Sequence, residues 1–239
     1  MVPATQLSII IPCYNPPAGW RENIVSNFSK IKKAIPDAEL IIVNDGSTKN
    51  FHYNEAEIFF SNFPGIKLIG YTENLGKGHA LREGVKIANS ELIVYTDIDF
   101  PYTHDSFLKI FELLKSDRND LVIGIRGKEY YTHLPKARVY ISKLLRAFIR
   151  FFLRIPTNDT QCGLKGINKK GEEVFLQTTI NRYLFDLEFI FLSARKKLSI
   201  KTVEVQLRPE VVLSKMNWKI LLHEFGNFLR VFALHITKR

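Results

Sequence analysis

The stretch Glu91-Leu-Ile-Val-Tyr-Thr-Asp-Ile-Asp-Phe-Pro-Tyr102 decides the fold that we expect for this chain. The apolar and β-branched run over 92–96 is typical of a buried strand, and Pro101 stops any continuation. Asp97 and Asp99 follow that strand directly. Ligands bind at the carboxyl ends of strands in an open α/β sheet, and paired carboxylates there suit Mg²⁺ or Mn²⁺ that carries a substrate phosphate. A polar strand end with an aspartate turn is the simpler alternative.

Strand-like and helix-like patterns alternate through the first half of the chain. Short apolar runs predict strands over 7–11, 39–43, 67–71, 91–96 and 120–125. Apolar residues at helical spacing predict helices over 21–35, 53–63, 79–88 and 104–116. This alternation predicts an α/β fold with a doubly wound, mainly parallel sheet and flanking helices.

The second half is richer in basic amphipathic segments. Further helices are predicted over 136–154, 170–177, 185–197 and 218–235, and a strand over 201–207. In residues 136–154, lysine and arginine are interleaved with leucine and phenylalanine. Such a helix suits an anionic membrane surface, although a domain helix with its apolar face in the core has the same pattern. We expect one main domain over 1–215 and an amphipathic C-terminal helix over 216–239.

Composition limits the classes of protein to consider. With 239 residues, 46% of them hydrophobic, the chain can bury a sizeable core. Its formal net charge of +10 favours anionic partners, namely nucleic acid, acidic lipid or phosphorylated substrates. Two cysteines, Cys13 and Cys162, exclude a small disulfide scaffold and favour a reduced, intracellular setting. No run of 18 apolar residues is present, so we predict no membrane-spanning helix and only peripheral membrane contact.

Polar residues follow each of the first four predicted strands. The four segments are Pro12-Cys-Tyr-Asn15, Asn44-Asp-Gly46, Asn74-Leu-Gly-Lys77 and Asp97-Ile-Asp99. In a parallel sheet all four would lie along one edge and line a single cleft. Gly76-Lys-Gly78 lacks the third glycine of a dinucleotide-binding fingerprint. A glycine-rich loop at a helix start suits a phosphate instead, and Lys77 adds a positive charge.

A set of short motifs occurs in a specific order along about residues 6–216. They are Ser8-Ile-Ile-Ile-Pro-Cys-Tyr-Asn15, Ile41-Ile-Val-Asn-Asp-Gly-Ser-Thr48, Asn74-Leu-Gly-Lys-Gly78, Tyr95-Thr-Asp-Ile-Asp99, Ile123-Gly-Ile-Arg126, Asp159-Thr-Gln-Cys-Gly-Leu-Lys165 and, more weakly, Ser214-Lys215. In this order and spacing the chain resembles glycosyltransferase family 2, whose members have the GT-A fold. It is most similar to the dolichyl-phosphate (polyprenyl-phosphate) mannosyl- and glucosyltransferases.

The resemblance implies a nucleotide-sugar site. The matching positions are Pro12, Tyr14, Asn15, Asp45, Gly46, Lys77 and Asp97. Among them, Pro12, Tyr14 and Asp45 would hold the base and the ribose. Asp99 would bind the metal, Mg²⁺ or Mn²⁺, directly. Asp97 would contact the nucleotide and reach the same metal.

The resemblance also implies a site for the phosphate of the acceptor. The matching positions are Arg126, Arg138, Ser142 and Lys215. Arg208, a candidate catalytic residue, would come with Lys215 from a loop that closes over the site, and guanidinium groups bind phosphate bidentately. The chain departs from the family at Pro16-Pro17, where a glutamate is usual, and this bears on base recognition. It departs again at Phe100-Pro101, which implies more water ligands on the metal.

These features together predict an inverting glycosyltransferase. It would move a hexose from a UDP- or GDP-linked sugar to a polyprenyl or dolichyl phosphate at the cytoplasmic face of a membrane. A lipid phosphate is an anion at pH 7 and needs no base. A hydroxyl acceptor, as in cell-wall or surface-glycan synthesis, needs a general base, for which Asp186 and Glu188 at a predicted helix start are the candidates. The sequence leaves both acceptors open.

Two other classes of function fit parts of the sequence. A basic nucleic-acid-binding module would bind with a steep salt dependence, but the chain has no recognised nucleic-acid motif. A non-catalytic partner subunit would bind a nucleotide sugar without turnover, and the intact Asp97-Ile-Asp99 argues against it. We therefore expect an enzyme whose partners are a nucleotide sugar and a lipid phosphate, and no nucleic acid.

Overall fold

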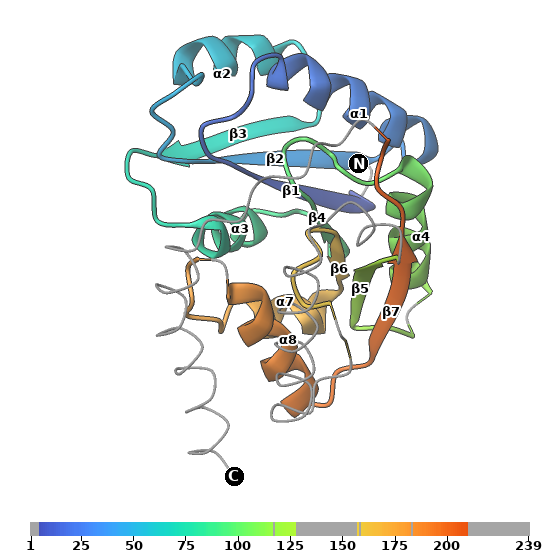
Figure 1. Ribbon diagram of the computed structural model, residues 1–239. Coiled ribbons are helices and arrows are strands. Elements are labelled where there is room, and N and C mark those ends of the chain that lie inside the picture. The colour runs from blue at the N-terminus through green and yellow to red at the C-terminus, as the bar shows by residue number, and fades with distance from the viewer. Residues whose placement is uncertain (1–4, 117, 128–156, 158, 183, 210–239) are drawn as a thin grey trace.

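In the part of the chain that the structure describes, seven strands form one sheet in the order β3-β2-β1-β4-β6-β5-β7 (Figure 1). The computed structural model describes residues 5–116, 118–127, 157, 159–182 and 184–209. The strands are β1 (Leu7–Cys13), β2 (Ala38–Asp45), β3 (Ile66–Tyr71), β4 (Ile93–Tyr95), β5 (Leu121–Arg126), β6 (Lys165–Ile167) and β7 (Ile200–Val205).

Every strand except β6 points the same way. β1 pairs in parallel with β2 and β4, β2 with β3, and β5 with β7. β6 is antiparallel to both β4 and β5, so those two strands share one direction. The parallel strands therefore end at a common edge. Because β2 and β4 lie on opposite sides of β1, their ends form a topological switch point, the place where open α/β sheets bind ligands.

Helices cover both faces of the sheet (Figure 1). On one face lie α1 (Trp20–Ala34), α2 (Tyr53–Ser61) and α4 (His104–Lys115). On the other lie α3 (Lys77–Lys86), α7 (Lys169–Phe175) and α8 (Phe185–Arg195). Strand residues alternate between the two layers, with Ile9 and Ile11 in the first and Ile10 in the second. Because both faces are covered, the strands need apolar residues on both sides, and their sequences read as continuous apolar runs.

The predicted fold class is confirmed, with two local differences. The sequence pattern does not predict β6, because three residues that begin with a lysine give no apolar run. α3 begins at Lys77 rather than at His79. The predicted helices 136–154 and 218–235, and the predicted boundary at 215, lie outside the described residues. Within the part of the chain that the structure describes, no helix combines the length and apolarity needed to cross a membrane.

Candidate functional site

The strand ends gather most of the predicted site residues along one edge of the sheet. At or shortly beyond the ends of parallel strands lie Pro12, Tyr14, Asn15, Asp45, Gly46, Asp97, Asp99, Arg126 and Arg208. β6 runs in the opposite direction, so its first residue, Lys165, and the preceding loop 159–164 lie at the same edge. α3 also starts there, at Lys77, directly after the loop that follows β3.

An ion pair joins Lys77 to Asp97 at the switch point. Lys77 opens α3 directly after Gly76, whose φ of 109° suits a glycine. The side chains stay 32% and 36% exposed, so a ligand can reach them. Burial would lower the pKa of this lysine, but three carboxylates, Asp97, Asp186 and Asp99, raise it above its ordinary value. The site therefore keeps a charged ammonium group at its centre.

Gly163 packs directly against Asp97. A Cβ at Gly163 would overlap Asp97 Oδ2, so only a glycine allows the loop to come this close. The hydroxyl oxygen of Tyr102 accepts hydrogen bonds from the Gly163 N–H and from the Cys162 thiol, both at 3.2 Å. The loop thus confines one carboxylate oxygen of Asp97 while Lys77 binds the other.

Asp99 is exposed, and its backbone carbonyl accepts a 2.7 Å hydrogen bond from Arg208 Nη2. Desolvation of the Asp99 carboxylate by neighbouring atoms and the charge of Asp97 raise the pKa of Asp99, so a divalent cation at this pair of carboxylates would relieve their repulsion. Over the described ranges, no group of three or more His, Cys, Asp and Glu side chains could hold a metal. Mg²⁺ commonly takes only one or two carboxylates and completes its shell with water and substrate phosphates. Asp97 and Asp99 therefore fit such an ion.

The carboxylate of Asp45 is directed into the protein. It is 2% exposed. Its donors are the Tyr71 hydroxyl at 2.8 Å, the Asn74 side-chain amide at 2.8 Å, and the N–H groups of Leu75 at 2.8 Å and Gly76 at 2.9 Å. These bonds hold the loop that leads into Lys77. A contact of Asp45 with the nucleotide stays a prediction.

Tyr14 and Asn15 follow β1 and differ in what they contact. Asn15 has a φ of 46°, and its Oδ1 accepts hydrogen bonds from Thr48 N at 2.8 Å and Lys49 N at 2.9 Å. It therefore shapes the turn after β2. The Tyr14 side chain is 50% exposed, so its ring is open to a ligand. Gly46, in the same turn, has a φ of 63°, and a Cβ there would lie 2.6 Å from the backbone nitrogen of residue 74.

Arg126 is engaged by Asp159. Its Nε donates to Asp159 Oδ2 at 2.8 Å, its Nη2 to Oδ1 at 2.5 Å, and its backbone N–H to Oδ2 at 3.0 Å. Burial would raise the pKa of Asp159, but the guanidinium holds it below its ordinary value. The predicted acceptor-phosphate arginine is thus pre-positioned by Asp159, which opens the motif over 159–165 but which the sequence does not mark as the partner of Arg126. Arg138, Ser142 and Lys215 lie outside the described residues.

The two candidate bases on α8 are both buried. Asp186 Oδ1 accepts hydrogen bonds from Lys165 Nζ at 2.7 Å and from the Tyr95 hydroxyl at 3.0 Å. Glu188 is 1% exposed and accepts from Thr179 N at 2.9 Å, so it holds the turn before α8. Lys165 ends the motif over 159–165, but the motif does not indicate that this lysine pairs with Asp186.

Arg82 holds a second loop against α3. Its Nη1 donates to Thr178 Oγ1 and to the carbonyl of Ile180, both at 3.1 Å, and its Nη2 donates to the side chain of Asn181. The N–H of Gly78 donates to the carbonyl of Asn181 at 2.7 Å. These contacts fix the loop over 178–181 beside the start of α3 and therefore beside Lys77.

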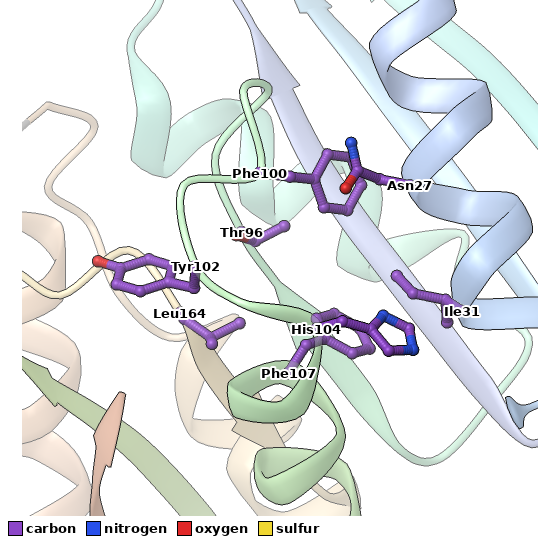
Figure 2. Close-up of a pocket in the computed structure, with 8 residues that line it drawn as sticks. All are labelled: Asn27, Ile31, Thr96, Phe100, Tyr102, His104, Phe107 and Leu164. Atoms are coloured by element: carbon purple, nitrogen blue, oxygen red, sulfur yellow. The ribbon is translucent and has the colours of Figure 1, made fainter. Parts of the chain in front are cut away.

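A small cavity lies between α1 and the start of α4 and is lined by Thr96 and Phe100, which flank the Asp97–Asp99 segment in sequence (Figure 2). Its lining residues are Asn27, Ile31, Thr96, Phe100, Tyr102, His104, Phe107 and Leu164. Its volume of about 20 Å³ admits one water molecule and no nucleotide. The candidate substrate site is therefore the open edge of the sheet, not this cavity.

Solved structures share this architecture. The glucosyl-3-phosphoglycerate synthase of Mycobacterium tuberculosis, solved with Mn²⁺, uridine diphosphate and glucosyl-3-phosphoglycerate, superposes with a TM-score of 0.67 at 17% identity. That match covers 97% of this chain and 80% of the other. The mannosyl-3-phosphoglycerate synthase of Rubrobacter xylanophilus gives a TM-score of 0.69 at 13% identity, over 98% of this chain and 74% of the other. At these identities the likeness shows the fold alone.

Sequence relatives extend over most of the chain. Dolichyl-phosphate beta-glucosyltransferase ALG5A of Trichomonas vaginalis is 26% identical over 96% of this chain and 73% of that protein. The dolichyl-phosphate beta-glucosyltransferase of Saccharomyces cerevisiae is 26% identical over 88% of this chain and 69% of that protein. The family model of Glycosyl transferase family 2 matches residues 8–175, which is more than half of the chain. By this match, and as its motifs predict, the chain belongs to glycosyl transferase family 2.

Proposed function

We propose that this glycosyltransferase moves a hexose, with glucose as the first candidate, from a UDP- or GDP-linked sugar to a dolichyl or polyprenyl phosphate. The relatives named dolichyl-phosphate beta-glucosyltransferase support the acceptor and the sugar. The observation that carries the proposal is the set of charges at the switch point, where Lys77 contacts Asp97 and Arg208 contacts the backbone of Asp99. Such an edge suits a sugar diphosphate.

The donor half of the reaction creates negative charge on the nucleoside diphosphate as the sugar leaves. Lys77 and Arg208 are the cations of the described site that can bind and orient that diphosphate. A divalent cation held by Asp99, with Asp97 beside it, would supply further positive charge against the leaving group. The Mycobacterium tuberculosis enzyme was solved with Mn²⁺ and with Mg²⁺, which supports this cofactor class.

The acceptor half places a nucleophile on the opposite face of the sugar, so that the anomeric carbon inverts. A lipid phosphate is already anionic at pH 7, so it needs cations to bind it and no base. Arg126 lies at the end of β5 on the same edge, its side chain is 18% exposed, and a guanidinium is a group that binds phosphate well. Arg138, Ser142 and Lys215 are proposed for the same group.

The decisive experiment is a panel of UDP- and GDP-linked hexoses with Mg²⁺ or Mn²⁺, assayed for donor hydrolysis and for transfer to a polyprenyl phosphate. We expect one sugar to be transferred to the lipid phosphate only when a divalent cation is present. Asp99→Asn should abolish transfer, and the matched surface change Asp105→Asn should not, because Asp105 is an exposed residue in the first turn of α4. No turnover of any donor would overturn the enzyme assignment.

A hydroxyl acceptor is the second candidate function, and one contact favours it. Asp186 is anchored through Oδ1 by Lys165 and Tyr95, and no hydrogen bond from the described residues reaches its Oδ2. A carboxylate that is anchored through one oxygen can use its other oxygen, here Oδ2, as a general base. Under this alternative, Asp186→Asn abolishes transfer to a sugar hydroxyl. Transfer to a lipid phosphate, which needs no base, would survive as slower turnover.

We propose further that the protein works at the cytoplasmic face of a membrane through peripheral contact. The support is the sequence of residues 136–154 and 218–235, where basic and aromatic residues are interleaved; both ranges lie outside the described residues. Co-sedimentation with vesicles tests this. Binding should require anionic lipid and fall as salt is added, and equal partitioning with neutral and anionic vesicles would contradict it.

A further inference from the structure

Lys165 is the most deeply buried cation in the described part of the chain. Its side chain is 0% exposed. Its ammonium group donates to Asp186 Oδ1 at 2.7 Å and to the carbonyl of Cys162 at 2.5 Å, and it lies 5.6 Å from the centre of the Tyr95 ring. A buried ammonium is costly unless its hydrogen bonds are satisfied. An apolar residue at position 165 would leave both acceptors, Asp186 Oδ1 and the carbonyl of Cys162, without this donor.

The first partner of Lys165 places α8 at the site. Asp186 lies in the first turn of α8, next to Phe185. Phe185 packs so closely on the start of α3 that a Cβ on Gly78 would lie 2.6 Å from the Phe185 Cβ. The Asp186 carboxylate is close enough to Lys77, the lysine that pairs with Asp97, for its charge to raise the pKa of that lysine.

The second partner of Lys165 places the loop before β6. Cys162 is followed by Gly163, whose backbone packs on Asp97 Oδ2. A displacement of the Cys162 carbonyl would therefore move the group that confines Asp97. One ammonium group thus connects two carboxylates at the site, Asp186 through an ion pair and Asp97 through the backbone of the loop.

Building on the proposed glycosyl transfer, we propose that Lys165 is a positioning residue for that reaction. It does not touch the substrate. It holds both the Asp186 carboxylate and the Cys162-Gly163 backbone in place. In this way it determines the positions of the Asp97 carboxylate and the Lys77 ammonium group relative to the sugar diphosphate.

The test compares Lys165→Met with Tyr95→Phe, which removes the other hydrogen bond to Asp186 Oδ1 without removing a charge. We expect Lys165→Met to lower kcat on the order of 10²-fold, because small misplacement of reacting groups has effects of that size. The KM for the donor should change less than kcat. Tyr95→Phe should lower kcat by less than tenfold. A folded Lys165→Met enzyme with the kcat of the wild type would overturn the proposal.

A variant that lacks both charges covers the case in which Lys165→Met does not fold. Removing one member of a buried pair leaves an uncompensated charge, whereas removing both is far better tolerated. Lys165→Met combined with Asp186→Asn should therefore fold and have a kcat no lower than the worse single variant, because the two residues act as one unit. A double variant with the kcat of the wild type would contradict the positioning role.

Crystal structures separate this inference from the proposed function. If the wild type turns over no donor, the proposed function fails, and the comparison of coordinates still tests Lys165. We expect the Asp186 carboxylate and the Cys162 carbonyl to be displaced in Lys165→Met relative to the wild type. If both groups stay in place, Lys165 does not position them.

Discussion

The aspartates along this edge of the sheet differ in their partners rather than in their chemistry. Asp45 is buried and bonded to the loop before α3, Asp97 is paired with Lys77, and Asp159 is paired with Arg126. Asp99 is exposed as a residue, but desolvation of its carboxylate by neighbouring atoms, together with the charge of Asp97, raises its pKa. Asp45, Asp97 and Asp159 are thus each engaged by a donor or cation of the protein. Asp99 is the carboxylate best placed to bind an incoming cation.

A cation that binds Asp99 should stabilise the folded protein. Mn²⁺ or Mg²⁺ binds the folded state selectively, and a concentration of about 100 times Kd stabilises by about 2.7 kcal/mol. We expect Mn²⁺ to raise the Tm of the wild type and of Asp105→Asn, and to leave that of Asp99→Asn unchanged. An equal rise in all three proteins would show that the ion binds elsewhere.

The close contact between Gly163 and Asp97 gives a second prediction. Gly163→Ala adds a Cβ that overlaps Asp97 Oδ2, so the carboxylate or the loop must move. We expect transfer to fall on the order of 10²-fold. Gly19→Ala is the matched control, because a Cβ at Gly19 meets nothing within 4 Å and the φ of 72° costs only about 1 kcal/mol of stability. Unchanged turnover in Gly163→Ala would show that Asp97 tolerates displacement.

The pair Arg126–Asp159 allows the acceptor role of the arginine to be separated from its structural role. Breaking a buried ion pair from either side destabilises by about 3–5 kcal/mol, so Arg126→Met and Asp159→Asn should both lower the free energy of unfolding. We expect only Arg126→Met to raise the KM for the lipid phosphate strongly. An equal change of KM in the two variants would mean that Arg126 acts only through Asp159.

At the scale of elements, the antiparallel strand β6 and the loop before α8 complete the site. β6 enters the sheet between β4 and β5 from the edge where the other strands end, and so brings the loop over 159–164 to that edge. The loop over 178–181 is held against α3 by Arg82. Neither segment follows the end of a parallel strand. The first packs against Asp97 through Gly163, and the second bonds to Gly78, the residue after Lys77.

Arg82 and its hydrogen bonds to Thr178, Ile180 and Asn181 form a clamp that holds the loop over 178–181 against α3. We expect loss of this clamp to lower both stability and activity. Arg82→Met removes hydrogen bonds to Thr178, Ile180 and Asn181 and leaves buried acceptors without a donor, which should lower the free energy of unfolding by about 2–4 kcal/mol. Transfer should fall as well, because the start of α3 loses its support. Denaturant unfolding at constant m-value measures the first effect.

The control for Arg82 is a surface arginine. Arg21→Met removes a side chain that is 33% exposed and pairs with Glu55 at 3.8 Å. An ion pair of this kind contributes about 0–1 kcal/mol, so stability should change little and activity should not change. The clamp would be refuted if Arg82→Met were as stable as Arg21→Met.

At the scale of the whole molecule, two buried carboxylates link stability to pH. Burial would raise the pKa of Glu39, but hydrogen bonds from Lys67, Ser8 and Asn89 hold it below its ordinary value, as Arg126 does for Asp159. A carboxylate with a lowered folded-state pKa stabilises the fold only while it is ionised. The contribution of both groups is therefore complete above about pH 5 and is lost as the pH falls through the folded-state values.

Urea unfolding between pH 3 and pH 7 checks this dependence. We expect the free energy of unfolding of the wild type to decline in acid. Glu39→Gln should be less stable at neutral pH and should lose less on acidification, because Glu39 no longer titrates. Transfer should be retained, since Glu39 lies at the start of β2, at the end of the sheet opposite the site. A Glu39→Gln protein with the full acid decline would exclude this group as a cause.

Local patterns were sufficient for the parts of the site that lie close together in sequence. Asp97 and Asp99 follow a buried strand, and Lys77 follows a glycine at a helix start, so strand polarity alone places them at one edge. Pairs such as Arg126–Asp159 and Lys165–Asp186 join residues far apart in the chain, and no periodicity marks them. β6 escapes prediction for a related reason, because its position depends on β4 and β5 rather than on its own three residues.

The sequence by itself determined the alternation of strands and helices, the mainly parallel sheet, the family, and the location of the candidate site at the strand ends. Hydrophobic periodicity and turn residues act locally, so they can be read from neighbouring positions. Only the tertiary structure decided which carboxylate meets which cation. Ion pairs and close packing depend on distances across the sheet, and for that reason Asp97 pairs with Lys77, Asp159 with Arg126, and Asp186 with the buried Lys165.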